Sequence, residues 1–153
     1  MWAALFSLNS TIVLIAWALL AFFPRKPLTG SIILYLGVGL LCLSYAALLI
    51  LVTSGSIDPG LPAGTAEVAV SFNSIAGVRG IFQSDSGVLI GWTHYLAFDL
   101  FIGLWISKDA DAKGFSRIAQ LPILFATLMA GPIGLLLWLV IRESRARMAG
   151  RAR

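Results

Sequence analysis

A long apolar run covers residues 27–57, PLTGSIILYLGVGLLCLSYAALLILVTSGSI, and contains no Asp, Glu, Lys or Arg. Two further stretches, residues 1–24 and 118–141, are also free of these charged residues. A helix needs about 20 mainly apolar residues to cross the hydrocarbon core of a bilayer, so each stretch is long enough to span it. The pattern therefore predicts an integral membrane protein.

The composition of the whole chain agrees with this prediction. Of its 153 residues, 59% are hydrophobic and 12% are charged, whereas a soluble globular chain is usually about a quarter charged and under half apolar. This composition excludes a soluble enzyme, a nucleic-acid-binding domain and a disordered tail. The excess of 11 Lys and Arg over 7 Asp and Glu is expected at helix ends. A single cysteine, Cys42, excludes an internal disulfide, and a chain with one histidine does not favour a metal site.

We predict an all-α membrane domain over residues 1–153, with four transmembrane helices and an amphipathic surface helix between the second and the third. The expected spans are residues 5–23, 28–53, 88–107 and 121–141, the surface helix is residues 65–83, and the basic tail is residues 142–153. The segment from Ser54 to Gly64 is rich in Gly, Pro and Ser, which is typical of a loop. The tail is expected to anchor the chain at the interface rather than to fold.

The loop cations do not decide the orientation of this four-span arrangement. They would place six Lys and Arg residues on the side of the two termini and five on the other side. No transit peptide precedes the first span, which favours a bacterial inner (cytoplasmic) or photosynthetic membrane. Membrane lipids are the expected surroundings, and the oligomeric state does not follow from the sequence.

The third expected span carries two ionisable residues, His94 and Asp99, at a depth where such groups are costly. An aspartate near mid-membrane costs roughly 2.5–3.5 kcal/mol on insertion scales, so Asp99 should face the bundle, a partner or water. Removal from water favours its neutral form, which is a proton donor. The two residues are five positions apart, or about 140° around a helix, so each is expected to line a cavity from a different side.

Further candidate residues surround Asp99 on this helix and on the next. Tyr95, one turn earlier, is within hydrogen-bonding reach of the carboxyl group. Pro132 is expected to kink the fourth helix and to free the carbonyl of Leu128, which could meet Asp99 or His94. The residues expected to contact a substrate are Trp92, Tyr95, Phe98, Phe101, Thr127, Gly131 and Pro132. The alternative is that these polar groups only bridge neighbouring helices and that the tryptophans are interface anchors.

The strings GWTHYLAFDLFIGLWISKD (91–109) and PILFATLMAGPIGLLLWLVIR (122–142) resemble the abscisic-acid-deficient-four-like family of small membrane proteins. The most specific part is Trp-x-His-x-Leu-x-x-Asp-Leu-Phe over residues 92–101. The resemblance extends from Phe72 to Arg142, and its other matching residues are Gly77, Val78, Phe82, Asp109, Pro132 and Gly134. At Leu104 the chain departs from the plant pattern, which has an arginine there.

The resemblance implies a four-helix plastid or bacterial membrane protein that acts on an apolar carotenoid or similar isoprenoid. The plant member is linked to the conversion of violaxanthin into neoxanthin, an isomerisation that needs no cofactor. That reaction requires one proton delivered to an epoxide oxygen and one removed from a neighbouring polyene carbon. Asp99 is the expected acid and His94 the expected base. The alternative is a non-enzymatic membrane subunit in which these residues hold helix packing or a partner.

Overall fold

The computed structural model describes residues 1–24, 26–65 and 69–151, with side chains described up to Glu143. The elements are α1 (Trp2–Phe22), α2 (Pro27–Ile32), the π-helix η1 (Ile33–Gly39), α3 (Leu40–Thr53), α4 (Ile75–Ile81), α5 (Asp85–Ala112), α6 (Arg117–Met129) and α7 (Gly131–Arg151). No strand occurs in the described ranges, so the predicted all-α class is confirmed.

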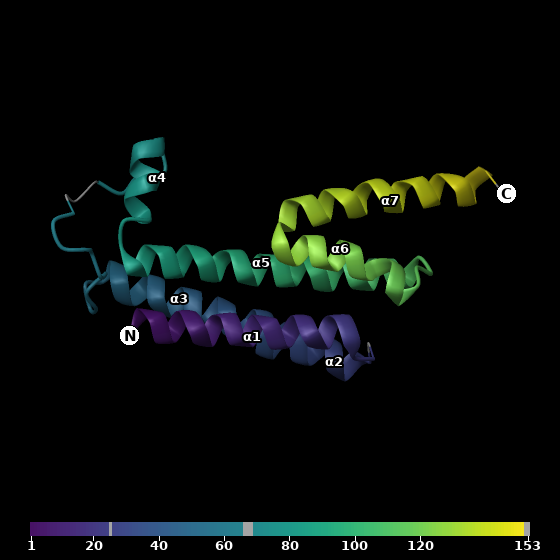
Figure 1. Ribbon diagram of the computed structural model, residues 1–153, viewed down its shortest axis with the longest axis horizontal. Helices are drawn as coiled ribbons and strands as arrows, with labels where there is room; N and C mark the ends of the chain where they lie inside the picture. The colour runs from purple at the N-terminus through teal and green to yellow at the C-terminus, as the bar shows by residue number, and fades with distance from the viewer. Residues whose placement is uncertain (25, 66–68, 152–153) are drawn as a thin grey trace.

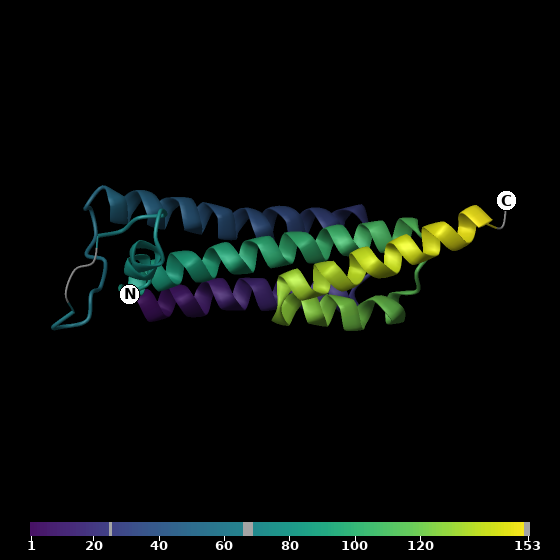
Figure 2. The same ribbon diagram turned by 90° about the horizontal axis from the view of Figure 1, so that it is seen from above.

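Three helices are long and apolar enough to cross a membrane. They are α1, the continuous stretch Pro27–Thr53 that contains α2, η1 and α3, and α5. Figures 1 and 2 show them running side by side with alternating direction. They correspond to the first three predicted spans. The loop predicted from Ser54 to Gly64 is also present and is not helical.

The three long helices approach closely because small residues lie at their crossing. A Cβ added at Gly37 of η1 would lie 3.0 Å from Leu100 of α5 and 3.1 Å from Ala16 of α1. A Cβ at Gly103 would overlap the ring of Trp17. Small residues are the usual means by which helices approach each other in membranes, where lipid is as apolar as the side chains.

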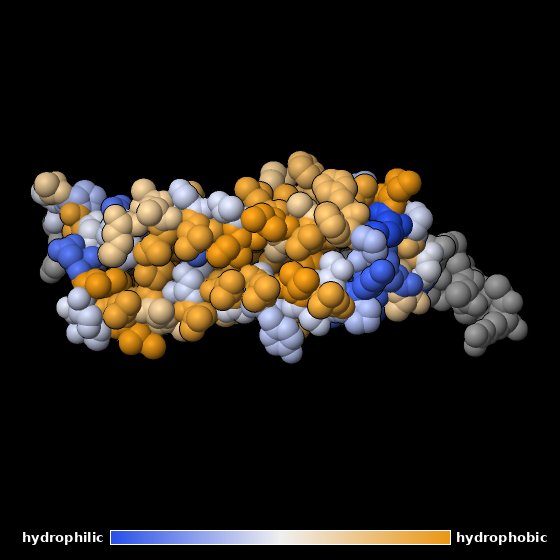
Figure 3. Space-filling model, turned by 90° about the horizontal axis from the view of Figure 1, so that it is seen from below, coloured by the Kyte–Doolittle hydropathy of each residue, from blue (hydrophilic) through white to orange (hydrophobic). Residues whose placement is uncertain are grey.

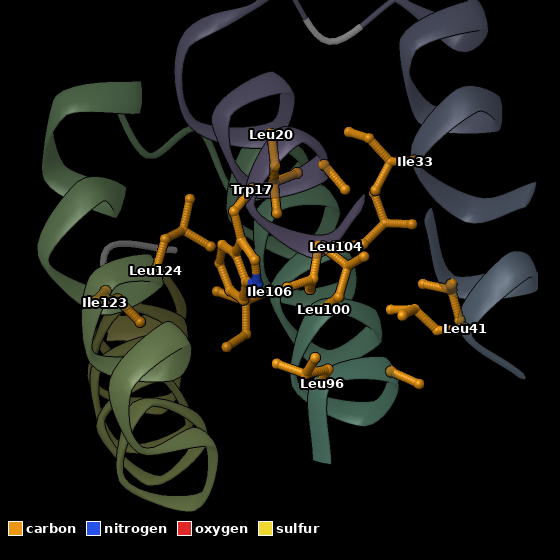
Figure 4. Packing of buried hydrophobic residues seen from close by; sticks show 14 of the residues in the cluster. Trp17, Leu20, Ile33, Leu41, Leu96, Leu100, Leu104, Ile106, Ile123 and Leu124 are labelled. Atoms are coloured by element: carbon orange, nitrogen blue, oxygen red, sulfur yellow. The ribbon is translucent and has the colours of Figure 1, made fainter. Parts of the chain in front are cut away.

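Buried apolar side chains from α1, η1, α3, α5, α6 and α7 form one core, part of which is shown in Figure 4. Trp17 lies in this core with 5% of its surface exposed, and Trp138 of α7 is fully buried. The expectation that the tryptophans are interface anchors is therefore wrong for these two. Large apolar side chains also cover the outside, including Leu14, Leu43 and Leu136. Figure 3 shows a long apolar band on one face of the molecule, as expected for a surface that faces lipid.

The predicted fourth span, residues 121–141, is not a single helix, and this prediction is wrong. The chain leaves the helical conformation at Ala130, with φ −157° and ψ 78°, so that α6 ends at Met129 and α7 begins at Gly131. Figure 1 shows α7 turning back along α6, which produces a helical hairpin in place of the expected kink. A Cβ at Gly134 would overlap Thr127, because the two helices pack directly against each other there.

The predicted surface helix, residues 65–83, is also wrong in extent. Only Ile75–Ile81 is helical, and residues 66–68 lie outside the described residues. This short helix, α4, begins where the Ser74 side chain accepts a hydrogen bond of 3.0 Å from the Gly77 N–H. The segment before α4 folds back onto this helix and does not extend it, since the Ser71 N–H donates a hydrogen bond of 3.4 Å to the carbonyl of Gly77. The basic tail, residues 142–153, is expected from the sequence to anchor the chain at the interface rather than to fold, but it continues α7 to Arg151, and residues 152–153 lie outside the described residues.

Candidate functional site

Asp99 lies at the middle of α5 and faces the turn of the α6–α7 hairpin. Its side chain is buried, with 8% of its surface exposed. The groups that interact with its carboxyl are the Tyr95 hydroxyl and the backbone N–H of Gly131. Gly131 is the first residue of α7, where backbone N–H groups have no helical partner and the helix dipole favours a negative charge. The hairpin thus brings a helix N-terminus to a buried ionisable group in the middle of α5.

The approach of the hairpin to Asp99 depends on glycine. A Cβ added at Gly131 would overlap the Asp99 carboxyl group, so only a residue without a side chain fits at this place. One carboxyl oxygen, Oδ2, is buried and has no hydrogen-bond partner within the described residues. A buried polar atom without a partner is rare and calls for an explanation, for which a bound ligand is one candidate.

Tyr95 joins Asp99 to a series of stacked aromatic rings. Its hydroxyl donates a hydrogen bond of 3.2 Å to the carbonyl of Met129, the last residue of α6. Its ring stacks on that of Trp92, with centroids 5.5 Å apart and planes 15° apart. Trp92 in turn stacks on Phe6 of α1 at 5.9 Å and 22°. The three rings form a ladder along one face of α5 that ends at Asp99.

A groove of about 320 Å³ lies beside this ladder. It is lined by Phe6, Phe82, Val88, Gly91, Trp92 and Tyr95. The residue that follows α4, Phe82, forms one wall, and its ring lies over Gly91, where a Cβ would come 2.5 Å from it. Almost all of the lining is apolar, so the groove suits an apolar chain or ring system rather than a water-soluble metabolite.

The core motif of residues 92–101 thus lies at the ladder and the buried carboxyl group. A family model described as ABA DEFICIENT 4-like matches residues 4–138, which is most of the chain. The chain belongs to the ABA DEFICIENT 4-like family. The resemblance found in the sequence is therefore confirmed, and it also extends over the first two spans. No curated protein and no solved structure matches the chain.

The ABA DEFICIENT 4-like motif divides between two faces of α5, and His94 lies on the face away from Asp99. Its ring is exposed and stacks on Phe98, with centroids 4.6 Å apart, while Tyr45 of α3 lies 5.6 Å away. Phe101 is also exposed, at 47%. The structure therefore brings Trp92, Tyr95 and Gly131 together with Asp99, and it does not bring His94 or Phe98 to this group.

The remaining candidates belong to the hairpin. Thr127 is fully buried, and its hydroxyl donates a hydrogen bond of 2.8 Å to the Ile123 carbonyl of its own helix. Pro132 is exposed at the second position of α7, where its missing N–H removes no helical hydrogen bond. The prediction that Pro132 frees the Leu128 carbonyl for Asp99 or His94 is not met. The carbonyl that accepts a hydrogen bond at this place is that of Met129, and the donor is the Tyr95 hydroxyl.

Two polar clusters of this ABA DEFICIENT 4-like chain were not found by reasoning from the sequence. In the first, the buried amide of Asn9 donates hydrogen bonds of 2.9 Å to Thr93 and 3.0 Å to Ser44, which joins α1, α5 and α3. Asn9 lies in the charge-free stretch 1–24, so hydropathy did not single it out, but its side chain carries an amide that can donate and accept hydrogen bonds. That amide is the signal that could have predicted an interhelical hydrogen bond.

The second cluster surrounds Asp109, near the end of α5. Its carboxylate accepts hydrogen bonds from Trp138 at 3.0 Å and from Arg142 at 2.8 Å, both on α7, and it pairs with Lys113 at 3.4 Å. Arg142 also lies 5.8 Å from the ring of Trp105. These contacts fix α7 against α5. No group of three or more His, Cys, Asp or Glu side chains that could hold a metal occurs among the described residues.

Proposed function

We propose that this protein binds a long, conjugated isoprenoid such as a carotenoid in the groove beside the Phe6–Trp92–Tyr95 ladder, in a bacterial or photosynthetic membrane. The observation that carries this proposal is the continuity of three stacked rings with a buried carboxyl oxygen for which the described part of the chain provides no hydrogen-bond partner. Flat aromatic faces suit the flat π-system of a polyene. An oxygen function at the end of such a molecule would supply the missing partner of Asp99.

We further propose that Asp99 acts as a general acid toward this oxygen function, which makes the protein a cofactor-independent isomerase. In its neutral form Asp99 would deliver a proton to an epoxide oxygen, and a base would remove one from a neighbouring carbon, so that the product is an isomer. If His94 were the base, the ligand would have to extend around α5, because His94 lies on the face away from Asp99. The Tyr95 hydroxyl is adjacent to Asp99 and is the nearer group for relaying a proton.

The test is expression in a carotenoid-producing bacterium, followed by purification and an absorption spectrum of any pigment that co-purifies. Trp92→Leu removes the middle ring of the ladder and should reduce bound pigment several-fold. Phe125→Leu is the matched control, since it removes an exposed ring of α6 that does not line the groove. Absence of pigment from several such hosts, or equal loss in both variants, would contradict the proposal.

Catalysis is tested separately by the products that the same hosts accumulate. Asp99→Asn should retain pigment and abolish its conversion, while Tyr95→Phe should slow conversion and His94→Gln should leave it nearly unchanged. An Asp99→Asn variant that converts pigment at the normal rate would exclude the acid role. Loss of conversion in His94→Gln, with pigment still bound, would instead favour His94 as the base.

The second candidate function is a non-enzymatic membrane subunit. The observation that favours it is the close fit of Gly131 on the Asp99 carboxyl group, together with the Tyr95–Met129 hydrogen bond, because both hold the hairpin in place. In that case Asp99→Asn and Tyr95→Phe would lower the yield of folded protein, and no pigment would co-purify.

A further inference from the structure

The two ends of the molecule differ in charge because the α6–α7 hairpin returns to the end from which it starts (Figure 1). Nine Lys and Arg residues lie within the described backbone, and Arg79, in α4, is the single one of these at the end that holds the N-terminus. The eight at the other end are Lys26, Lys108, Lys113, Arg117, Arg142, Arg145, Arg147 and Arg151. Figure 3 shows a group of strongly hydrophilic residues near this end, in addition to hydrophilic residues at the opposite end.

This distribution of charge bears on the orientation that a four-span arrangement leaves undecided. A single long fourth helix would carry the arginines of α7 to the opposite side of the membrane, whereas the hairpin keeps them beside Lys108 and Arg117. Loop cations remain on the cytoplasmic side in most membrane proteins. An excess of eight to one is large enough to place the cation-rich end there.

A crevice opens at the cation-rich end, between α1, the start of α2 and η1, and the end of α5. Its volume is about 460 Å³. Lys26 and Lys108 line it together with the hydroxyl residues Thr29 and Ser31. Toward the middle of the molecule its walls are apolar and are formed by Leu20, Ile33, Leu34 and Leu104. The crevice thus combines a cationic mouth with an apolar interior, which is the polarity of a phospholipid.

The two lysines of the crevice differ from other cations at this end. Lys113 and Arg142 both pair with Asp109. Lys26 and Lys108 have no ion-pair partner among the described residues, and both side chains are exposed. Asp111 also lines the crevice, and its Oδ1 accepts a hydrogen bond of 2.9 Å from Gln120. The mouth therefore presents two ammonium groups and one engaged carboxylate to a ligand.

We propose that this end faces the cytoplasmic leaflet and that the crevice binds the phosphate head group of an anionic phospholipid between Lys26 and Lys108. The acyl chains of the lipid lie along the apolar wall formed by Ile33 and Leu34. Anionic lipids are attracted to basic segments at the membrane surface, and pockets of this kind between membrane helices bind their head groups. The site is distinct from Asp99 and does not depend on the function proposed above.

The test measures thermal unfolding of the whole protein in detergent with three added probes: short-chain phosphatidylglycerol, short-chain phosphatidylcholine and inorganic phosphate. Phosphatidylglycerol should raise the unfolding midpoint at concentrations at which the other two probes have no effect. Lys26→Gln and Lys108→Gln should each weaken this response about fivefold. An equal response to phosphatidylcholine would overturn the proposal, and an equal response to inorganic phosphate would show a site for soluble phosphate instead of lipid.

Two further variants keep the test specific. Lys113→Gln removes a cation from the same end but outside the crevice, so it should leave the response unchanged. Lys108→Arg keeps the charge and should retain most of the binding. If Lys113→Gln weakens the response as much as Lys108→Gln does, the attraction is general to this end and the crevice is not a site.

The orientation has its own test, based on the single native cysteine. In a Cys42→Ser background, Ser56→Cys places a thiol in the loop after α3, and Ala112→Cys places one at the end of α5. A membrane-impermeant maleimide added to intact bacteria should label Ser56→Cys at once and Ala112→Cys only after the cells are permeabilised. The opposite pattern, or labelling of both in intact cells, would overturn the proposed orientation.

Discussion

Two carboxyl groups of α5, those of Asp99 and Asp109, contact α7 and are surrounded very differently. Asp109 accepts hydrogen bonds from Trp138 and Arg142 and pairs with Lys113, so its charge is compensated by protein. Asp99 is buried and interacts with one hydroxyl and one backbone N–H, and its Oδ2 has no hydrogen-bond partner among the described residues. Both lie against α7, one at its first turn and one at its polar end. A compensated carboxylate holds structure, whereas an uncompensated one is available to a ligand.

The largest expected effect comes from the close packing at Asp99 rather than from its charge. Gly131→Ala should destabilise the protein by about 3 kcal/mol, since the added Cβ overlaps the carboxyl group and the hairpin must move. The free energy of unfolding by sodium dodecyl sulfate in mixed micelles measures this. Gly30→Ala is the control. Its Cβ comes no closer than 4.0 Å to Lys108, and Ala in a helix is favoured over Gly, so stability should rise slightly. Equal effects of the two changes would contradict the close fit.

The second effect tests the compensated carboxylate. Asp109→Asn should cost about 2 kcal/mol, because charge-assisted hydrogen bonds from Arg142 and Trp138 to this residue are weakened. Measured in the same way, Lys113→Gln should cost less than about 0.5 kcal/mol, because it removes only a partly exposed ion pair between residues one helical turn apart. If the two variants are equally stable, the contacts of Asp109 do not fix α7.

A smaller effect is expected at the polar cluster of the three long helices. Asn9→Ala removes the hydrogen bonds to Ser44 and Thr93 and should cost about 1 kcal/mol. Thr11→Ala, on the exposed side of α1, removes only a bond to the Ser7 carbonyl and should change stability little. A loss at Asn9 as small as that at Thr11 would show that this cluster contributes nothing to packing.

The smallest change in stability is expected for Asp99→Asn, and it tests whether Asp99 and Asp109 differ in their structural role. Asp99→Asn keeps the shape of the side chain and should change the free energy of unfolding by less than about 0.5 kcal/mol. The contrast with Asp109→Asn is the measurement of interest, since the same chemical change is made at two places on one helix. A loss at Asp99 equal to that at Asp109 would mean that both carboxylates are structural.

Hydropathy predicted the first three spans because each is a run of about 20 mainly apolar residues, which is what a span requires, even though the third run contains Asp99. The same property could not distinguish a fourth span from a hairpin. Residues 118–141 are free of charge in either case, and Gly131 and Pro132 are compatible with a kink or a reversal. The reversal depends on the backbone of Ala130 and on the fit of Gly131 to Asp99, which are properties of the folded chain.

The candidate site could be predicted in part for a similar reason. Asp99 and Tyr95 were identifiable because an ionisable residue in an apolar helix and a tyrosine one turn away need no knowledge of the fold. Phe6 was not, because its ring reaches Trp92 from a helix far away in the sequence. His94 was paired with Asp99 by residue type. Helical geometry already predicted that His94 and Asp99 lie on different faces of the helix. In the structure the His94 ring lies beside the rings of Phe98 and Tyr45.

The hairpin also has a consequence for biosynthesis. On the proposed orientation, α6 and α7 enter and leave the membrane on the side where the chain is synthesised. The arginines that follow Arg142 therefore never have to cross the bilayer, which would cost roughly 2.5–3.5 kcal/mol for each charge at its centre. The pair can dock as one unit onto α5 after the three long helices are inserted, and the Asp99 site is complete only when this last step has taken place.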